Sequence, residues 1–389
     1  TVLLHFVGYR QVTVFTDRIG HLALEPDCLI KEQALGNLPQ RKWILLAPPG
    51  RVANLHLLGY WQPHFHIVRS QVLCFVIGSM SRWGLMRHDV GHYVRAIGHA
   101  QAAYRVYAQW GLRPPLLRLV PDDEAWADDM LEQLGLPPDA WFVCMHARES
   151  GFSPVDEALH SHRNGSVENL LPAAQEVVRR GGWVIRIGDA SMAPMPVMPQ
   201  LIDYARHGMK SARMDVVLCA RARFILGNSS GIALVGSLFG TPCALANMVP
   251  VSALGVSPLD ISIPKLHWSM SMQRYLHFPE LFASPLSRAQ YSRLFDEAGV
   301  VPMENSADDI RDLAGEMMDR LEGPETTRND GNNLNRTFMS LFDENHYARD
   351  AMTTIGTRFL VRHRQLLDPI REATQHDEPA HSSPSVNRC

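Results

Sequence analysis

The sequence predicts an α/β fold in which short parallel strands alternate with helices. Two stretches carry this prediction. Between Phe142 and Asp189, an apolar run is followed by a polar loop, an amphipathic stretch and a second apolar run. Between Phe224 and Gly240, the order strand, small polar turn and apolar helix returns. Strand-length and helix-length patterns that alternate in this way are typical of parallel sheets covered by helices.

The amino-terminal third shows the same alternation. Short apolar runs predict strands, and longer amphipathic stretches predict helices. Pro121 and the acidic residues after it predict a helix start, because acidic side chains are favourable near a helix amino terminus. Val72–Ile77 is the most hydrophobic segment, and its length suits a buried strand. We expect further strands at Val2–Val7, Trp43–Ala47, His64–Val68 and Leu116–Val120, and helices at Val52–Trp61, Val94–Trp110 and from Pro121 to about Gly135.

The second half contains loops between further helical patterns. Ala190–Gln200 is rich in Pro and Met and is expected to form a loop over the site. Asp260–Phe278 is also expected to be a loop. The expected helices are Ala289–Ala298, Asp308–Leu321 and a closing helical segment within Phe338–Arg371.

A chain of 389 residues is long enough for two domains of ordinary size. Pro137-Pro138 marks the expected boundary, because two consecutive prolines interrupt regular structure. We therefore predict two domains, at 1–137 and 138–330, followed by a helical segment at 331–374 and a disordered tail at 375–389.

The composition narrows the class of protein. The net charge of −3 gives no electrostatic reason to expect nucleic acid as a partner. The six cysteines are scattered without a CxxC pair, as in reduced cytoplasmic proteins. No apolar run approaches the length of a membrane span. His160 and His162 lack further ligands at a recognisable spacing, so we expect no metal site.

Charged and small polar residues follow the expected strands, where open α/β sheets bind ligands. His146 and Arg148 follow the first strand, and Arg186, Gly188 and Asp189 follow the second. Arg163 and Asn164 lie in the loop between them. A guanidinium group matches the oxygens of a phosphate, so these arginines are candidate diphosphate ligands. Each arginine could equally form an ordinary surface ion pair.

The turn Asn228-Ser229-Ser230-Gly231 opens an apolar helix, and free backbone N–H groups at a helix start suit a phosphate. Ser is also a favoured N-cap, so an ordinary cap is compatible with the same residues. Neither a GxGxxG nor a P-loop motif occurs in a suitable context. This argues against a dehydrogenase and a P-loop kinase.

These residues resemble a family of bacterial surface-polysaccharide glycosyltransferases. The matching motifs are HARESG (146–151), RNGSVEN (163–169), GGWVIRIGD (181–189), IDYA (202–205), MDVVL (214–218), SSG (229–231) and, more loosely, RIGHL (18–22). The resemblance implies a GT-B fold like that of heptosyltransferases and fucosyltransferases. In this fold two Rossmann-like domains face a central cleft, so residues 1–137 would form the acceptor side and residues 138–330 the nucleotide-sugar side. The resemblance also implies a nucleotide-diphosphate sugar as donor, no metal or other cofactor, and a glycan, lipid-linked or small-molecule acceptor.

A transfer of this kind needs a base for the acceptor hydroxyl and positive charge on the leaving diphosphate. We expect Arg148 to stabilise the leaving group. For the base, Glu25 is the first candidate and His21 the second, with Asp27 in the same region. All three follow the first turn, where related inverting enzymes often hold the base. A surface position would explain any of them equally well.

The expected location is the cytoplasm, with a peripheral position at the inner membrane as the alternative. Two other readings stay open at this stage. A sugar-nucleotide 2-epimerase would share the fold and the diphosphate site, but would convert a nucleotide sugar without an acceptor. A non-catalytic sugar-binding or partner-docking protein descended from such enzymes would bind nucleotide weakly or not at all.

Overall fold

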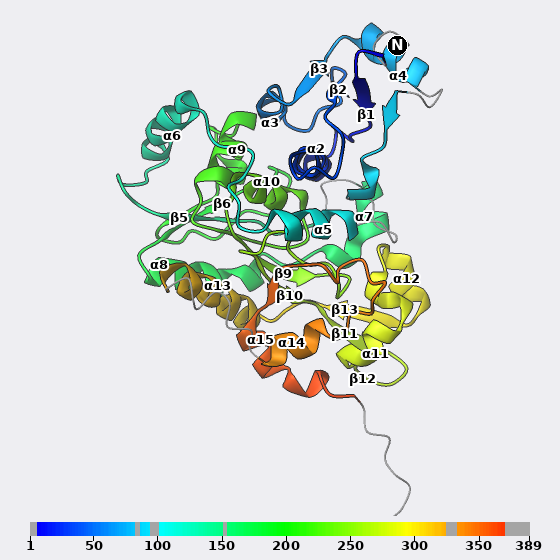
Figure 1. Cartoon of the computed structure of the whole chain (residues 1–389). Helices are drawn as coiled ribbons and strands as arrows, with labels where there is room; N and C mark the ends of the chain where they lie inside the picture. The colour runs from blue at the N-terminus through cyan, green and yellow to red at the C-terminus, as the bar shows by residue number, and fades with distance from the viewer. Residues whose placement is uncertain (1–5, 82–85, 94–100, 151–153, 324–332, 370–389) are drawn as a thin grey trace, which may run out of the picture.

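The computed structural model describes residues 6–81, 86–93, 101–150, 154–323 and 333–369. In this part of the chain, strands form two parallel sheets and one small antiparallel sheet. Figure 1 shows the smaller parallel sheet above the larger one. The fold class is therefore α/β with parallel sheets, as the sequence predicts. The two-domain arrangement around a cleft stays a prediction.

The smaller parallel sheet has the strand order β3-β2-β1-β4. A helix follows each of its first three strands along the chain, and α2 covers one face. The strands are β1 (Tyr9–Val12), β2 (Lys42–Leu46), β3 (Phe65–Val68) and β4 (Arg87–His88), and the helices are α2 (Ile19–Ala34), α3 (Leu55–Tyr60) and α4 (Gln71–Ser81). Two further helices, α5 (Gln101–Trp110) and α6 (Pro121–Gln133), lead to the larger sheet.

The larger sheet has the order β14-β10-β9-β8-β5-β6-β7, and the pairings between its described strands are parallel. Every residue of the central strands β5 and β9 is buried. Continuous burial of this kind is expected for a parallel strand that is covered on both faces. The strands are β5 (Phe142–Met145), β6 (Trp183–Arg186), β7 (Leu201–Ile202), β8 (Ile225–Gly227), β9 (Cys243–Met248), β10 (Ile261–Pro264) and β14 (Thr354–Ile355).

Helices cover both faces of the larger sheet. In Figure 1, α9 (Ala212–Arg221) and α10 (Gly231–Phe239) lie above it, and α8 (Leu171–Arg179) and α13 (Ala307–Glu322) lie below. The antiparallel sheet, of order β12-β11-β13, lies beside α12. Its strands are β11 (Leu266–Ser269), β12 (Arg274–Tyr275) and β13 (Val300–Met303), and the remaining helices are α7 (Pro154–His160), α11 (Phe278–Ala283), α12 (Ser292–Glu297), α14 (Asn333–Met339) and α15 (Thr357–Arg362).

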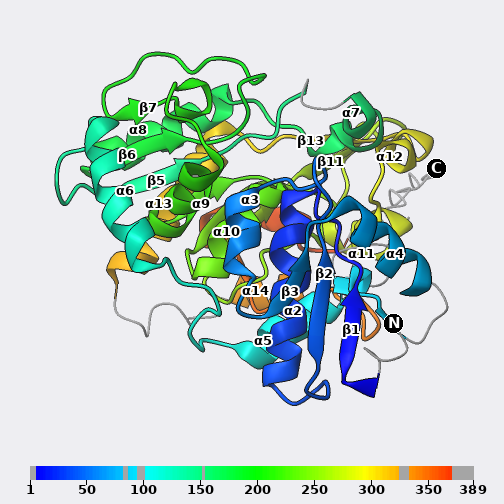
Figure 2. The ribbon, with the colours of Figure 1, turned by 90° about the horizontal axis from the view of Figure 1, so that it is seen from above.

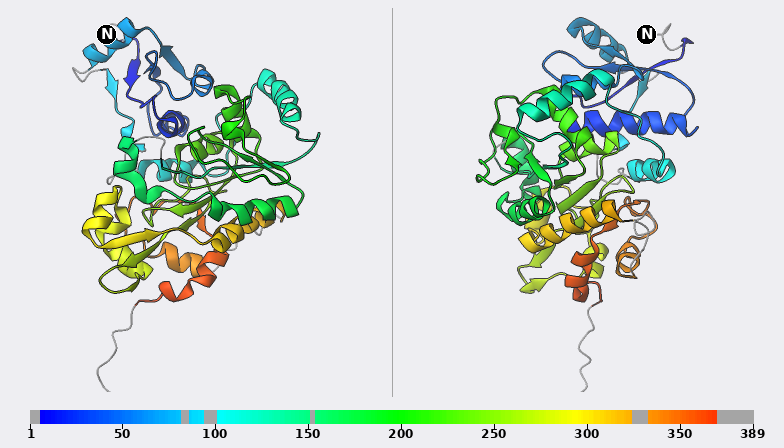
Figure 3. Two further views of the ribbon diagram at one scale, coloured as in Figure 1. Left: turned by 180° about the vertical axis from the view of Figure 1, so that it is seen from behind. Right: turned by 90° about the vertical axis from the view of Figure 1, so that its left-hand side faces the viewer.

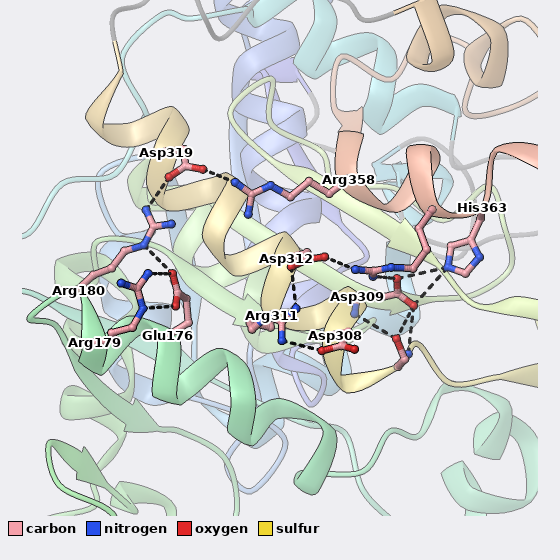
Figure 4. Close-up of polar contacts among 12 residues, drawn as sticks. Glu176, Arg179, Arg180, Asp308, Asp309, Arg311, Asp312, Asp319, Arg358 and His363 are labelled. Carbon is pink, nitrogen blue, oxygen red and sulfur yellow. Dashed lines mark hydrogen bonds and ion pairs between the residues drawn. The ribbon is translucent and has the colours of Figure 1, made fainter.

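Ion pairs join the helices below the sheet. Arg180 lies 2.9 Å from Glu176 and 2.6 Å from Asp319, and so links α8 to α13. Arg358 lies 2.7 Å from the same Asp319 and adds α15 to the group. Figure 4 shows this lower charge network, which also contains the pairs of Arg362 and His363 with Asp309. In this network each of these arginines has a carboxylate partner.

Several sequence expectations are confirmed and others are wrong. The strands predicted at Trp43–Ala47, Phe142–Met145 and Trp183–Ile187 are present within one residue. At Leu116–Val120 there is no strand. Val72–Ile77 is part of the exposed helix α4 and not a buried strand. The predicted loop at Asp260–Phe278 contains three strands, one paired in the larger sheet and two in the antiparallel sheet.

Other expectations meet the limits of the described residues. Residues 6 and 7 are not strand, and the first strand begins at Tyr9; the rest of Val2–Val7 lies outside the described residues. Residues 94–100 of the expected helix and the tail 375–389 also lie outside them. Pro137-Pro138 falls in the loop between α6 and β5, and the domain ranges stay a prediction. The cysteines of the described chain are free and buried: Cys28, Cys74, Cys144, Cys219 and Cys243.

Candidate functional site at the junction of two helix amino termini

Two helix amino termini meet between the parallel sheets. Helix α2 starts at Ile19 after β1, and α10 starts at Gly231 after β8. Figures 1 and 2 show the two helices side by side. A Cβ atom added to Gly20 would lie 2.9 Å from the Cα of Gly231, and one added to Gly231 would lie 2.7 Å from the backbone nitrogen of Gly20. The two glycines therefore let the backbones touch.

Neither helix start is capped by the side chain of its N-cap residue, Arg18 or Ser230. The first N–H groups of a helix have no partner within the helix, and the peptide dipoles add a partial positive charge there. Two such ends at one junction attract anions, and phosphates in particular. Gly231, a predicted phosphate ligand, therefore also has a packing role against Gly20.

Three arginines surround this junction, and we call them the junction arginines: Arg18, Arg148 and Arg163. Arg18 donates to both carboxylate oxygens of the buried Asp156, each at 2.8 Å. Arg148 lies 3.4 Å from the backbone oxygen of Asp156. Arg163 donates to the backbone oxygen of Ser229, next to the start of α10. They come from three separate loops of the chain.

The junction arginines are incompletely neutralised. Within the described residues, neither Arg148 nor Arg163 forms an ion pair with a carboxylate, and the buried Nε of each has no hydrogen-bond partner. Burial, and then the charge of Arg148, lowers the pKa of Arg163 to about 10. Burial likewise lowers the pKa of Arg148. Depressed guanidinium pKa values mean that the surroundings disfavour this positive charge, so a bound anion would stabilise it.

Asn228 joins the two loops that carry these arginines. Its Oδ1 accepts a hydrogen bond from the backbone N–H of Arg148 at 3.0 Å, and its Nδ2 donates to the backbone oxygen of Arg163 at 3.4 Å. Asn228 is almost fully buried. The sequence prediction placed it against phosphate, whereas these contacts give it the role of positioning the arginines.

The loop that follows Arg163 is also held firmly. Asn164 donates to the carboxylate of Glu157 at 2.9 Å, and its backbone oxygen accepts from the Nζ of Lys265 at 2.7 Å. The backbone N–H of Gly165 donates to the backbone oxygen of Arg148 at 2.9 Å. Lys265 is buried, and burial lowers its pKa to about 8. These contacts fix the loop and with it the position of Arg163.

His146 lies at the end of β5 and lines a small cavity with Asn228 and Asn247. Its Nδ1 donates to the backbone oxygen of Ile187 at 3.1 Å. Burial lowers its pKa to about 4, and the charges of Arg186 and Arg148 act in the same direction. Because Nδ1 carries the single proton of the neutral ring, Nε2 can only accept a hydrogen bond, and the ring adds no positive charge.

Arg186 does not lie free to bind a phosphate in this arrangement. Its side chain has no exposed surface, and its two terminal nitrogens donate to Asp203 at 3.0 Å and to Glu149 at 3.1 Å. The same carboxylates accept from the backbone N–H groups of Met195 and Ala193. Two carboxylates balance the charge of Arg186. We therefore reassign it from diphosphate ligand to anchor of the 190–200 loop.

Gly188 and Asp189 belong to the same loop. Gly188 has a φ of 147°, which favours glycine, and Met192 covers it so closely that an added Cβ would lie 2.4 Å from the sulfur. Asp189 is exposed, and its Oδ1 accepts from the backbone N–H of Ser191 at 2.9 Å. Both residues thus shape the turn after β6, and their contact with a nucleotide stays a prediction.

The candidate bases His21 and Glu25 form a pair. The two side chains differ in exposure, which the sequence does not reveal. The Nδ1 of His21 lies 2.7 Å from the Oε1 of Glu25. The Oε2 of Glu25 accepts from the backbone N–H of Phe15 at 3.3 Å. Glu25 is fully buried, whereas 23% of the His21 side chain is exposed. His21 can therefore reach a substrate, and Glu25 lies behind it.

Asp27, the third candidate, is fully buried in the core of α2. Its carboxylate pairs with Lys31 at 2.6 Å and accepts from the hydroxyl of Tyr107 at 2.8 Å. Lys31 lies 3.7 Å from the centre of the Tyr107 ring. Asp27 therefore has a structural role and is removed from the list of candidate bases.

Sequence reasoning missed Arg18, Asp156 and Lys265 as parts of the site. A signal for Arg18 was present, since it precedes the first helix in the same turn as Gly20. Asp156 and Lys265 follow no strand of the predicted sheet and gave no signal. Among the described residues, no group of three or more His, Cys, Asp or Glu side chains is placed to hold a metal ion.

The parallel sheets, with two helix starts meeting between them, define an α/β protein with a glycosyltransferase-like fold. The crystal structure of the glycosyl transferase family 9 protein from Veillonella parvula DSM 2008 is similar, with a TM-score of 0.50 and 11% identity, over 81% of this chain and 98% of that chain. At this identity the likeness shows the fold alone.

Two further solved structures match less well. The E. coli ADP-heptose lipopolysaccharide heptosyltransferase II has a TM-score of 0.43 and 13% identity, over 66% of this chain and 90% of that chain. The E. coli heptosyltransferase TibC, dodecameric and iron-containing, was solved with ADP-D-β-D-heptose. It has a TM-score of 0.42 and 13% identity, over 80% of this chain and 76% of that chain. No protein-family model and no curated protein matches the sequence.

Proposed function

We propose that this protein is a glycosyltransferase that moves a sugar from a nucleotide-diphosphate donor to an acceptor hydroxyl. The junction of α2 and α10 carries the proposal, because it joins two uncapped helix starts and two arginines without carboxylate partners in the described chain. A leaving diphosphate needs this positive charge. The fold similarity to a glycosyltransferase family 9 structure supports the same class of reaction.

Arg148, Arg163 and the helix starts bind the diphosphate and stabilise the charge that grows on it as the bond to the sugar breaks. These groups supply the positive charge that a metal ion provides in other transferases, so the proposed reaction is metal-independent. Asn228 and Lys265 hold the two arginine loops, so the arginines need little rearrangement when the donor binds.

His21 acts as the general base. It follows Gly20 directly in α2, whereas Arg148 and Arg163 come from the segment after β5. In an inverting transfer, the acceptor hydroxyl attacks from the face opposite the leaving diphosphate and loses its proton to the Nε2 of His21. The carboxylate of Glu25 accepts from Nδ1, orients the ring and stabilises the imidazolium that forms. Glu25 is thus a positioning residue.

The first experiment is a thermal-shift screen with UDP, GDP, CDP, dTDP and ADP, since a ligand that binds the folded state raises its melting temperature. One nucleoside diphosphate should stabilise the protein more than its monophosphate. The corresponding nucleotide sugars are then incubated with the protein, with and without acceptor glycans.

Release of nucleoside diphosphate that depends on an acceptor supports the proposal. Conversion of the nucleotide sugar without an acceptor would instead identify an epimerase. If a nucleotide binds but no tested mixture yields product, and the His21→Ala variant binds the nucleotide equally well, the protein is a binding protein and the catalytic part of the proposal is wrong.

A further inference from the structure

Helix α4 packs against its sheet through small and polar residues, whereas an ordinary surface helix packs through its apolar residues. Only Cys74 and Ser81 of this helix are buried. The Sγ of Cys74 donates to the backbone oxygen of Val68 at 3.2 Å, and Ser81 donates to the side chain of Gln11. Gly78, between them, faces Leu46 at the end of β2. Small and polar residues at positions 74, 78 and 81 thus form the inward face.

The opposite face of α4 is apolar and exposed. Amphipathic helices of globular proteins normally turn their apolar stripe inward. Here the exposed fractions lie between 42% and 74%, for Val72, Leu73, Phe75, Val76 and Met80. Contiguous exposed apolar patches of this kind mark interaction sites. We call these five side chains the α4 apolar face.

The surroundings of the α4 apolar face are basic. The helix itself contains no charged residue. Arg69, just before it, and Arg87, on the adjacent strand β4, are both exposed. Residues 1–118, which include the whole smaller sheet, contain thirteen Lys and Arg and five acidic residues, although the whole chain has a net charge of −3. The amino-terminal part of the chain is therefore positive and the remainder acidic.

The α4 apolar face and the basic residues around it together indicate the kind of partner. An exposed apolar helix face among basic side chains fits the surface of an anionic lipid bilayer, where the apolar groups enter the acyl boundary and the cations meet the phosphates. Two copies of this chain joined through α4 would bring like charges together. No helix in the described ranges is long and apolar enough to cross a membrane. The contact would thus be peripheral.

We propose that the α4 apolar face binds the surface of an anionic lipid bilayer, with Arg69 and Arg87 contacting lipid phosphates. Figures 1 and 3 show α4 at the end of the molecule opposite to α14 and α15, so the remainder extends away from the bilayer. The proposal does not depend on the identity of the reaction. It gives the chain a defined orientation at a membrane.

The test is co-sedimentation of the full chain with vesicles of phosphatidylcholine alone and of phosphatidylcholine with phosphatidylglycerol. The protein should bind the anionic vesicles much more strongly, and added salt should weaken this binding. A V72S/F75S double variant should bind at least about tenfold more weakly than the wild type, because two apolar side chains no longer enter the bilayer. Arg69→Gln should weaken binding to anionic vesicles about fivefold.

Val361→Ser is the matched control, because Val361 is a 59% exposed apolar residue on α15, at the other end of the molecule. It should bind like the wild type. All variants replace exposed side chains, and unchanged melting temperatures would confirm that they fold. Equal binding of V72S/F75S and wild type would overturn the proposal. So would a wild-type dimer that V72S/F75S converts to a monomer, since the occupant would then be a second copy.

Discussion

Arginine side chains meet opposite conditions in the lower charge network and at two of the junction arginines, Arg148 and Arg163. In the network of α8, α13 and α15, the arginines at 180, 358 and 362 each lie against a carboxylate (Figure 4). At the junction of α2 and α10, Arg148 and Arg163 have none among the described residues. Paired arginines fasten helices together. Incompletely neutralised arginines, held in place by loop contacts, leave positive charge for a ligand.

The pKa values of the two regions reflect this difference. In the network, burial of Asp309 would raise its pKa, but hydrogen bonds from His363, Ser306 and Arg362 outweigh burial and lower it to about 2. At the junction, burial and a like charge lower the pKa of Arg163 to about 10. The network thus stabilises its charges, whereas the junction disfavours its own. The predictions below test whether the first region serves stability and the second serves binding and catalysis.

The largest expected effect concerns the base beside the junction. His21→Ala should lower kcat by a factor of about 10²–10⁴, the usual contribution of a general base, and leave nucleotide affinity unchanged. Glu25→Gln should lower kcat by a smaller factor, because the ring is no longer oriented and the imidazolium that forms is no longer stabilised. Steady-state kinetics measure both. Full turnover by His21→Ala together with loss in Glu25→Gln would return the base role to Glu25.

The next effect concerns the lower charge network. Asp309→Ala should lower the free energy of unfolding by about 1.5–3 kcal/mol, because the buried carboxylate accepts hydrogen bonds from Ser306 and Arg362 that the variant loses. Urea denaturation measures this loss. Asp308→Ala is the control, because Asp308 is exposed and should change stability by less than about 0.5 kcal/mol. Nucleotide affinity should stay the same in both variants. A large loss of affinity in Asp309→Ala would erase the functional contrast between the regions.

The contact of the two helix starts gives a third prediction. Gly231→Ala should lower the free energy of unfolding by about 1–3 kcal/mol, because its methyl group would force the backbones of α2 and α10 apart. It should also weaken nucleotide binding. Gly59→Ala, in α3, is the control, since an added Cβ there meets nothing within 4 Å. A Gly231→Ala protein that melts and binds like the wild type would show that the junction is looser than described.

These cases also show which features of the fold and the site can be predicted from the sequence. The buried strands of the larger sheet were predictable, because continuous apolar runs between turns have few other solutions. The spacing of His21 and Glu25, four residues apart on one helix, could have indicated a pair. Which of them is exposed depends on how α2 packs. The roles of Arg186 and α4 depend on partners distant in sequence, Glu149 and Asp203 for the first and the sheet for the second.

The smallest expected effect is a change in a histidine pKa that reports the charge of the junction. Burial, and then Arg163, lowers the pKa of His162 to about 3. The ring is therefore neutral in the folded state, and its contribution to stability is present above pH 6.5, the usual unfolded value, and decreases as the pH falls towards 3. Arg163→Ala should raise the His162 pKa, as measured by NMR titration. An unchanged pKa would mean that burial alone sets it.

The central claim is that Arg163 binds the diphosphate of the donor, whereas the paired Arg180 does not. Isothermal titration calorimetry with the nucleoside diphosphate found in the thermal-shift screen tests it most directly. Arg163→Ala should weaken binding by about 1.5–3 kcal/mol, the usual value of a hydrogen bond to a charged group. Arg180→Ala should bind with wild-type affinity while it unfolds at lower urea. Wild-type affinity in Arg163→Ala, or equal losses in both variants, would contradict the claim.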